Sequence, residues 1–278
     1  MANSNGWGDG AANNAIGWGK GSDNAIGWGS VYSVSSAGLT DIVGVAPVDA
    51  DAQAFITAAA ITDPTQQSAI NTLVVDLKGY NIWTKMKALY PFVGGTASTH
   101  KWNLKDPRDL DAAFRMVFNG GWTHNSNGIT GNGINTEGFT KLIPNVNLTT
   151  TSGSLGFYLR NTIISNSYDL ATNGAFFGIA LYIDTRYYMY GGLTSISGLP
   201  SPAFYGLSRV GGTHKGYRNG TVNLTSTSAA TLNSNEILFR TNLRNYAFGF
   251  IGDGLTDTEN TNLYTAVQAF QTTLGRNV

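Results

Sequence analysis

The sequence contains no cysteine, which excludes disulfides, thiol catalysis and cysteine-bound zinc. Charge is also scarce, because only 12% of the residues are charged, about half of the usual share of roughly 25%. The 17 basic and 17 acidic side chains cancel, so we expect no polybasic surface for nucleic acid or anionic membranes. No apolar run approaches the roughly 20 residues that span a bilayer. The sequence therefore predicts neither a nucleic-acid partner nor membrane insertion.

Small and neutral polar residues are abundant instead. The chain has 35 glycines, 31 threonines and 27 asparagines among its 278 residues. Threonine favours strands, whereas asparagine and glycine favour turns. This composition predicts a β-rich protein with a neutral surface of hydroxyl and amide groups.

A short repeat occupies the N-terminal region. Ala15–Gly19 (AIGWG) returns as Ala25–Gly29, and Asn5–Gly8 (NGWG) is a degenerate first copy. A ten-residue unit cannot bury a tryptophan alone, so its ring must pack against other units, other chains or other proteins. Residues 1–48 are interpreted as an attachment or oligomerisation arm, with a flexible linker as the alternative. The contact residues expected there are Trp7, Ile16, Trp18, Ile26 and Trp28.

Residues 49–96 have a helical pattern and are expected to form a small neck module. Asp63-Pro64 with Gln66 predicts a helix start, and Gly79 predicts its end. Shorter helices are expected over Ala54–Ile61 and Ile82–Leu89.

Residues 97–278 have mainly strand patterns and end in a helix. The fold class predicted from them is mainly β, an antiparallel β-sandwich or jelly roll with a C-terminal helix. Asn219-Gly220 predicts a type I′ hairpin, Ile237–Thr241 is expected to pair with Ala247–Ile251, and Thr256 with Glu259 predicts a capping box. Further strands are expected at Ala113–Phe118, Leu155–Leu159, Phe176–Asp184, Tyr187–Tyr190 and Phe204–Val210.

The acidic residues do not form a recognisable catalytic motif. A glycosidase needs two facing carboxyl groups, which two acids at alternate positions of one strand would supply. No predicted strand carries such a pair. Asp106, Asp109 and Asp111 could bind Ca²⁺, but Lys105 and Arg108 favour a neutralised turn. The three histidines stand apart in sequence, so we predict no catalytic residue, no cofactor and no bound metal.

Two aromatic segments combine rings with hydrogen-bonding groups, as sugar sites on β scaffolds do. The alternative is that these rings fill the core or a subunit interface. The candidate glycan contacts are Trp122, His124, Asn125, Tyr187, Tyr188 and Tyr190.

Several segments resemble a known family. Phe250–Thr256, which runs into Leu274–Arg276, and the hairpin Tyr217–Gly220 are similar to concanavalin A-like (laminin G-like) lectin and glucanase domains of phage structural proteins. Tyr90–Gly95 and Phe118–His124 resemble segments from phages of Bacteroidetes-type bacteria. The Gly-Trp-Gly repeats resemble N-terminal arms of virion proteins. The resemblance implies a lectin-like fold and a virion origin, and it implies no enzymatic motif.

These observations lead to three hypotheses. The first is a virion structural protein, namely a fibre, spike or head-decoration subunit, which is expected to form a homo-oligomer with three copies. Its arm would contact capsid or tail proteins, and its lectin-like domain would bind host-surface carbohydrate. Met1–Gly8 carries no recognisable secretory signal, so release by host lysis is expected. The second is a glucanase or depolymerase on the same sandwich, and the third is a secreted adhesin.

Overall fold

The computed structural model describes residues 48–161, 163, 167–172, 177–181, 185–189, 192–196, 201–227, 232, 234–240 and 242–278, with only the backbone at 185–189 and 192–196. Residues 48–278 form one compact unit. The five contact residues expected in the arm, Trp7 to Trp28, lie outside the described residues. Within the described part, no helix combines the length and the apolar character needed to cross a bilayer.

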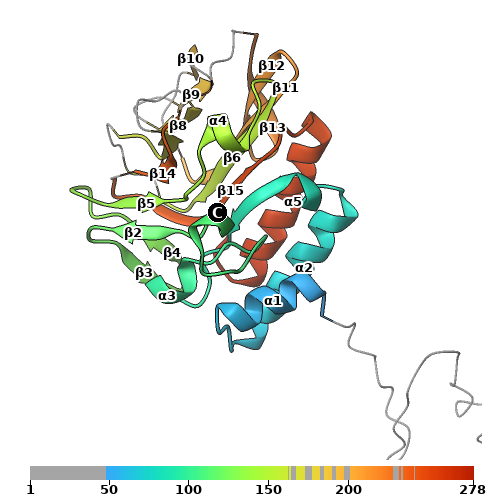
Figure 1. Ribbon diagram of the computed structural model, residues 1–278, viewed down its shortest axis with the longest axis vertical. Helices are drawn as coiled ribbons and strands as arrows, with labels where there is room; N and C mark the ends of the chain where they lie inside the picture. Colours follow the sequence, from blue (N-terminus) through green and yellow to red (C-terminus); the bar gives the residue numbers. More distant parts are fainter. Residues whose placement is uncertain are drawn as a thin grey trace, which may run out of the picture. The chain divides into compact units, whose positions relative to one another are not determined.

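Two antiparallel sheets form the body of the molecule (Figure 1). The larger sheet has the strand order β13-β12-β11-β6-β15-β4-β3, with β1 pairing separately with β15. Its strands are β1 Met86–Tyr90, β3 Thr123–Asn125, β4 Gly128–Thr130, β6 Ser152–Leu159, β11 Ala203–Val210, β12 Thr213–Arg218, β13 Thr221–Ser226 and β15 Asn245–Gly252.

The second sheet has the order β10-β9-β8-β7-β14-β5-β2. Its strands are β2 Val117–Asn119, β5 Glu137–Phe139, β7 Leu170–Thr172, β8 Phe177–Leu181, β9 Thr185–Met189, β10 Gly192–Ile196 and β14 Ile237–Phe239. Side chains from both sheets meet in one hydrophobic cluster, which includes Phe157 and Tyr205 of the larger sheet and Ile179 and Phe239 of the smaller one. The predicted β-sandwich is thereby confirmed.

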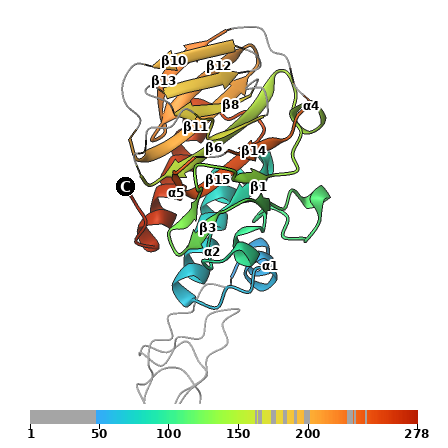
Figure 2. The same cartoon turned by 90° about the vertical axis from the view of Figure 1, so that its left-hand side faces the viewer.

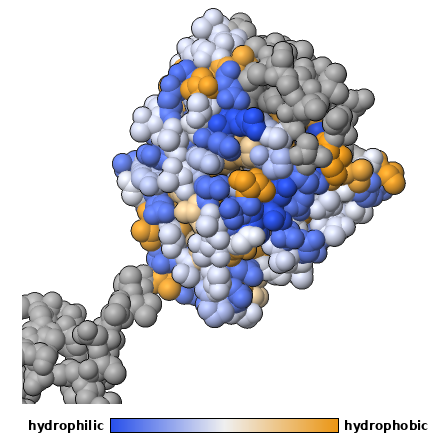
Figure 3. Space-filling model, turned by 180° about the vertical axis from the view of Figure 1, so that it is seen from behind, coloured by the Kyte–Doolittle hydropathy of each residue, from blue (hydrophilic) through white to orange (hydrophobic). Residues whose placement is uncertain are grey.

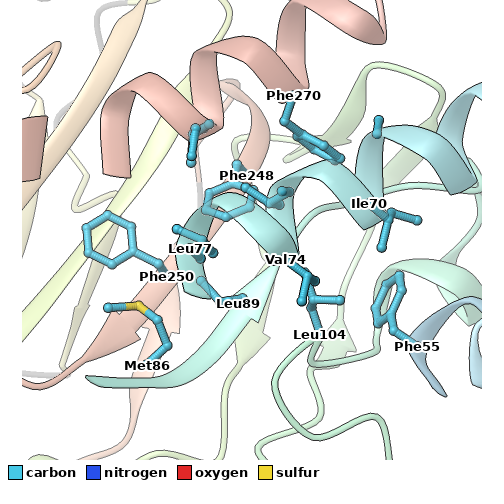
Figure 4. Close-up of a cluster of buried hydrophobic side chains, with 14 of the residues drawn as sticks. Phe55, Ile70, Val74, Leu77, Met86, Leu89, Leu104, Phe248, Phe250 and Phe270 are labelled. Carbon is cyan, nitrogen blue, oxygen red and sulfur yellow. The ribbon is translucent and has the colours of Figure 1, made fainter. Parts of the chain in front are cut away.

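Helices cover the outer face of the larger sheet. They are α1 Ala50–Ala58, α2 Pro64–Gly79 and α5 Asp257–Thr273, and Figure 4 shows the apolar cluster that joins them to the strands. Phe270 of α5 and Leu77 of α2 meet Phe248 and Phe250 of β15 in this cluster. Because β6 and β15 are covered on both faces, all but the first residue of β6 and all of β15 are buried.

Two helix caps and one turn expected from the sequence are confirmed, whereas the short helix expected over Ala54–Ile61 lies at Ala50–Ala58. The Asp63 side chain accepts a hydrogen bond from Gln66 N at 2.8 Å and caps α2. Thr256 and Glu259 form the expected capping box of α5. Asn219 and Gly220 both have positive φ angles, 48° and 72°, as a type I′ turn between β12 and β13 requires.

The predicted helix over Ile82–Leu89 is wrong. Residues Trp83–Lys85 form one 3₁₀ turn, η1, and β1 then pairs antiparallel with β15. Met86 and Leu89 contribute to the cluster beneath the helices, whereas Ala88 and Tyr90 contribute to the core between the sheets. Four of the five residues of β1 are thus buried, and a short, mostly apolar run of this kind does not distinguish a buried strand from a helix.

Two strand predictions also need correction. β14 and β15 do not pair, because they belong to different sheets. Between them the chain passes Arg244, whose Nη1 donates to both oxygens of Asp169 at 2.9 Å in a fully buried ion pair. The expected strand Ala113–Phe118 is instead split between the 3₁₀ turn η2 Asp111–Ala113, a left-handed residue at Phe114, and β2.

Candidate functional site

Two of the predicted sugar contacts pack inside an aromatic cluster. Trp122 and His124 are half-buried, and the Phe118 ring lies edge-on to both, with centroid distances of 5.9 Å and 4.7 Å. Asn125 is exposed, and its Oδ1 accepts from Asn127 N at 2.8 Å in the turn after β3. The structure therefore brings Trp122, His124 and Asn125 together, but the rings of Trp122 and His124 pack against Phe118.

The other predicted contacts belong to a different place. Tyr187 and Tyr188 lie on β9, in the smaller sheet, and their side chains, like Tyr190 as a whole, lie outside the described residues. His124 and Asn125 of β3 are thus in the larger sheet, whereas Tyr187 and Tyr188 are in the smaller one.

A histidine pair lies beside the Phe118 cluster. The Nδ1 atoms of His100 and His124 are 3.1 Å apart, and Gly95 N donates to His100 Nε2 at 3.2 Å. This acceptor role assigns the His100 proton to Nδ1 and makes the ring neutral. Burial, together with His124 and Arg276, lowers the pKa of His100 to about 3.

The acidic segment 106–111 is neutralised by cations. Arg108 donates to both oxygens of Asp106 at 2.7 Å and 2.6 Å. Asp109 contacts Lys101 and Arg115, and Asp111 contacts Arg115. Arg108 thus acts as the sequence predicts, whereas Lys105 does not join the pairs. Among the described residues, no group of three or more histidine and acidic side chains could hold a metal ion.

Lys105 instead lines an open groove of about 490 Å³, here called the β1–α4 groove. Its wall comes from β1, from the segment after α3 (Ala97–His100) and from α4 (Pro144–Asn147). Figure 2 shows β1 and α4 on the same side of the molecule. The lining residues are Met86, Lys87, Lys105, Asp106, Phe114, Val146 and Asn147.

One buried amide, Asn103, holds this groove together. Its Oδ1 accepts from Leu89 N at 2.9 Å and from Lys105 N at 3.0 Å. Its Nδ2 donates to Lys87 O at 3.0 Å and to Ala113 O at 2.9 Å. Asn103 therefore binds the free edge of β1 and fixes the backbones of both groove lysines and of the residue before Phe114.

Phe114 has a left-handed conformation, with φ 57° and ψ 38°. A bulky residue in this region costs about 1–2 kcal/mol. The Tyr90 hydroxyl donates to Phe114 O at 2.7 Å, and Phe114 N donates to Asp111 O at 2.9 Å. These bonds hold the half-buried ring against the core between the sheets while it also lines the groove.

The two groove lysines differ in their partners. Lys87 Nζ lies 3.1 Å from Asp253 Oδ1. Lys105 Nζ lies 4.4 Å from the centroid of the buried Trp83 ring, and within the described part of the chain no carboxylate pairs with it. Burial lowers the pKa of Lys105, with nearby Lys78 acting in the same direction and Asp51 opposing it. The positive charge of Lys105 is therefore less completely balanced by nearby carboxylates than that of Lys87.

A second hollow, the β12–α5 cleft, has a volume of about 440 Å³. Lys215 Nζ contacts both oxygens of Asp257 at 2.8 Å and 2.7 Å, and the Tyr217 hydroxyl donates to Asp257 Oδ1 at 2.8 Å. The two charged side chains of this cleft, Lys215 and Asp257, thus form an ion pair with each other.

Sequence reasoning missed the β1–α4 groove. Its lining residues come from three segments whose proximity depends on Asn103 and on the strand β1. The local signal in the sequence is the group of charged residues around Lys105, and such a group is typical of a neutralised turn.

No family model and no curated protein matches the sequence. Among solved structures, the binding domain of botulinum neurotoxin serotype D is 10% identical, with a TM-score of 0.43 over 66% of this chain and 52% of that one. Domain 4 of AbnA, an extracellular arabinanase from Geobacillus stearothermophilus solved with arabinotriose, is 13% identical, with a TM-score of 0.41 over 64% of this chain and 98% of that one.

A third similar structure is the sialidase of Trypanosoma rangeli in complex with sialic acid. It is 10% identical, with a TM-score of 0.39 over 55% of this chain and 30% of that one. This chain therefore spans about half of the toxin chain and less than a third of the sialidase. These similarities are loose, and neither the fold nor the site described above rests on them.

Proposed function

We propose that this protein is a structural subunit of a phage particle whose lectin-like domain binds glycans on the host surface. The observation that supports this function best is the β1–α4 groove. There, an asparagine and two lysines line the same open groove as an aromatic residue and an exposed valine on the β-sandwich. This combination suits a sugar, which presents hydroxyl groups and a weakly polar ring face.

The surface supports the same proposal. Figure 3 shows a face on which hydrophilic and intermediate residues prevail and hydrophobic residues are scattered. With a formal net charge of zero, the chain has no strong overall field to attract polyanions such as nucleic acid.

Adhesion by a single shallow groove would be weak, and several copies held together would strengthen it by avidity. We propose that the Gly-Trp-Gly arm supplies this multivalency by joining the subunits into a homo-oligomer, namely a trimer. The same arm would attach this trimer to capsid or tail proteins. The protein would then be made in the host cytoplasm and released in the virion by lysis.

Binding is proposed in preference to glycan hydrolysis. A general acid must keep its proton near neutral pH, which requires a raised pKa. The hydrogen bonds from Arg108 instead lower the pKa of Asp106, the carboxyl group of the groove. That carboxyl group is therefore poorly suited to act as the general acid of a glycosidase.

The proposal is tested with the full chain and a version lacking residues 1–30. We expect light scattering to give a defined oligomer for the full chain and a monomer for the shortened one. The full chain should also bind immobilised host-surface polysaccharide far more tightly than the shortened one. Antibodies against the chain should label purified phage particles. The proposal would be refuted if the full chain were monomeric, bound no polysaccharide, and its antibodies failed to label the particles.

A further inference from the structure

We propose that the β1–α4 groove selects glycans that carry a carboxylate, with Lys105 as the residue that determines this specificity. The inference rests on the proposed glycan-binding function and names the class of sugar.

Among the charged side chains that line the groove, the Lys105 ammonium is the one without an ion-pair partner in the described part of the chain. Asp106 is occupied by a two-pronged pair with Arg108, and Lys87 is paired with Asp253. Lys105 lies over the Trp83 ring, and no carboxylate of the described residues forms an ion pair with it, although Asp51 offsets part of its charge without a direct contact. A bound anion would compensate this partly desolvated ammonium, which gains more from an ion pair than a fully hydrated one does.

The position of this cation is built into the fold. Asn103 is buried and makes four hydrogen bonds, two of which reach the backbones of Lys87 and Lys105. The ring of Trp83, itself buried, lies beneath the Lys105 ammonium, with 4.4 Å between Nζ and the ring centroid. An ammonium held in this way loses less conformational freedom on binding than a free surface lysine does.

The remaining walls favour a sugar over a small inorganic anion. Val146 is 72% exposed, and Phe114 is half-buried, so both can cover the C–H face of a pyranose. The Asn147 side chain accepts from Ile143 N at 2.8 Å through Oδ1. No described residue accepts from its Nδ2, which is therefore available to a sugar hydroxyl.

The test uses the full chain and four immobilised probes. Trigalacturonate and sialyllactose carry the carboxylate on two different sugar types, lactose is the neutral comparison, and polyglutamate is a peptide anion. We expect the two acidic sugars to bind at least tenfold more tightly than lactose and polyglutamate. A preference for one acidic sugar over the other would identify the source of the carboxylate.

Variants then assign the binding to this groove. Lys105→Gln should weaken acidic-sugar binding about tenfold and abolish the preference over lactose, whereas Lys105→Arg should keep it. Lys215→Gln, in the β12–α5 cleft, is the matched control and should bind like the native chain. Unchanged thermal unfolding of the variants excludes a folding defect.

The outcomes separate this inference from the proposed function. Equal binding of lactose and acidic sugars, or loss of binding in Lys215→Gln alone, would overturn the inference and leave glycan adhesion standing. Equal binding of polyglutamate would assign the groove to acidic peptides and overturn it as well. Failure of the oligomeric full chain to bind any glycan would overturn the proposed function together with the inference.

Discussion

The imidazole of His100 shows how burial sets the charge state of a single residue. Its Nε2 accepts from Gly95 N and its Nδ1 faces His124, so protonation would require a new partner in a closed aromatic environment. The pKa of about 3 that follows from burial is far below the ordinary value of 6.5. A neutral His100 is therefore part of the native structure.

This shift predicts acid sensitivity. As the pH falls below about 6.5, the unfolded chain binds a proton that the folded chain excludes, so the free energy of unfolding should decrease. The decrease should continue towards pH 3, by up to about 1.4 kcal/mol for each pH unit. Urea unfolding at several pH values measures it.

His100→Gln is the diagnostic variant for that measurement. It should reduce the pH dependence, leaving the contributions of His124, whose pKa is also lowered by burial, and of His214, whose pKa is lowered to about 4 by burial and by Arg209. A variant with the native pH profile would show that His100 does not carry the effect.

The buried ion pair between Arg244 and Asp169 gives a second prediction at this scale. Asp169 also accepts from the Tyr246 hydroxyl at 2.5 Å and from Leu181 N at 2.7 Å. Arg244→Met should destabilise the fold by about 3–5 kcal/mol, because it leaves a buried carboxylate without its cation. Arg108→Met, which removes an exposed partner of Asp106, is the control and should leave the urea midpoint unchanged. Equal midpoints for the two variants would contradict the prediction.

Helix α5 depends on its first turn. Thr256 Oγ1 accepts from Glu259 N, Thr256 N donates to Glu259 Oε2 at 2.8 Å, and Glu259 also pairs with Lys85 of η1. The same few residues thus begin the helix and attach it to the chain before β1.

Thr256→Ala should therefore cost about 1 kcal/mol of folding free energy. Thr258→Ala, an exposed change in the same turn, is the matched control and should have a much smaller effect. Chemical unfolding of both variants by circular dichroism makes the comparison. A larger loss for Thr258→Ala would show that the capping box is not what stabilises this helix end.

In residues 48–278 the helices and the larger sheet share one hydrophobic cluster. Leu77 of α2 and Phe270 of α5 meet the same cluster as Phe250 of β15, and α5 follows β15 in the chain (Figure 4). Neither the helical layer nor the larger sheet could keep its buried face covered without the other.

Cooperative unfolding of this unit is the corresponding prediction. Leu77→Ala should destabilise it by about 2–5 kcal/mol, because it leaves a cavity in the shared cluster. Native-state hydrogen exchange should record the same loss for the slowest amides of α2 and of β6. A loss confined to α2 would mean that the helical layer unfolds separately from the sandwich.

The sequence alone determined the features that depend on neighbours within about four residues. The caps at Asp63 and Thr256 and the turn at Asn219-Gly220 are of this kind, since a side chain or a positive φ angle satisfies the backbone locally. The strand-rich composition likewise predicted the sandwich, because most strands alternate with recognisable turns.

Only the tertiary structure decided the features that depend on distant partners. Met86–Tyr90 becomes a strand because β15, more than 150 residues later, supplies its hydrogen bonds, and β14 and β15 separate because each is paired elsewhere. The β1–α4 groove exists because Asn103 joins β1 to the segment of Lys105 and Phe114. Such long-range pairings leave no periodic signal in the chain, since their free energy arises only when the partners meet.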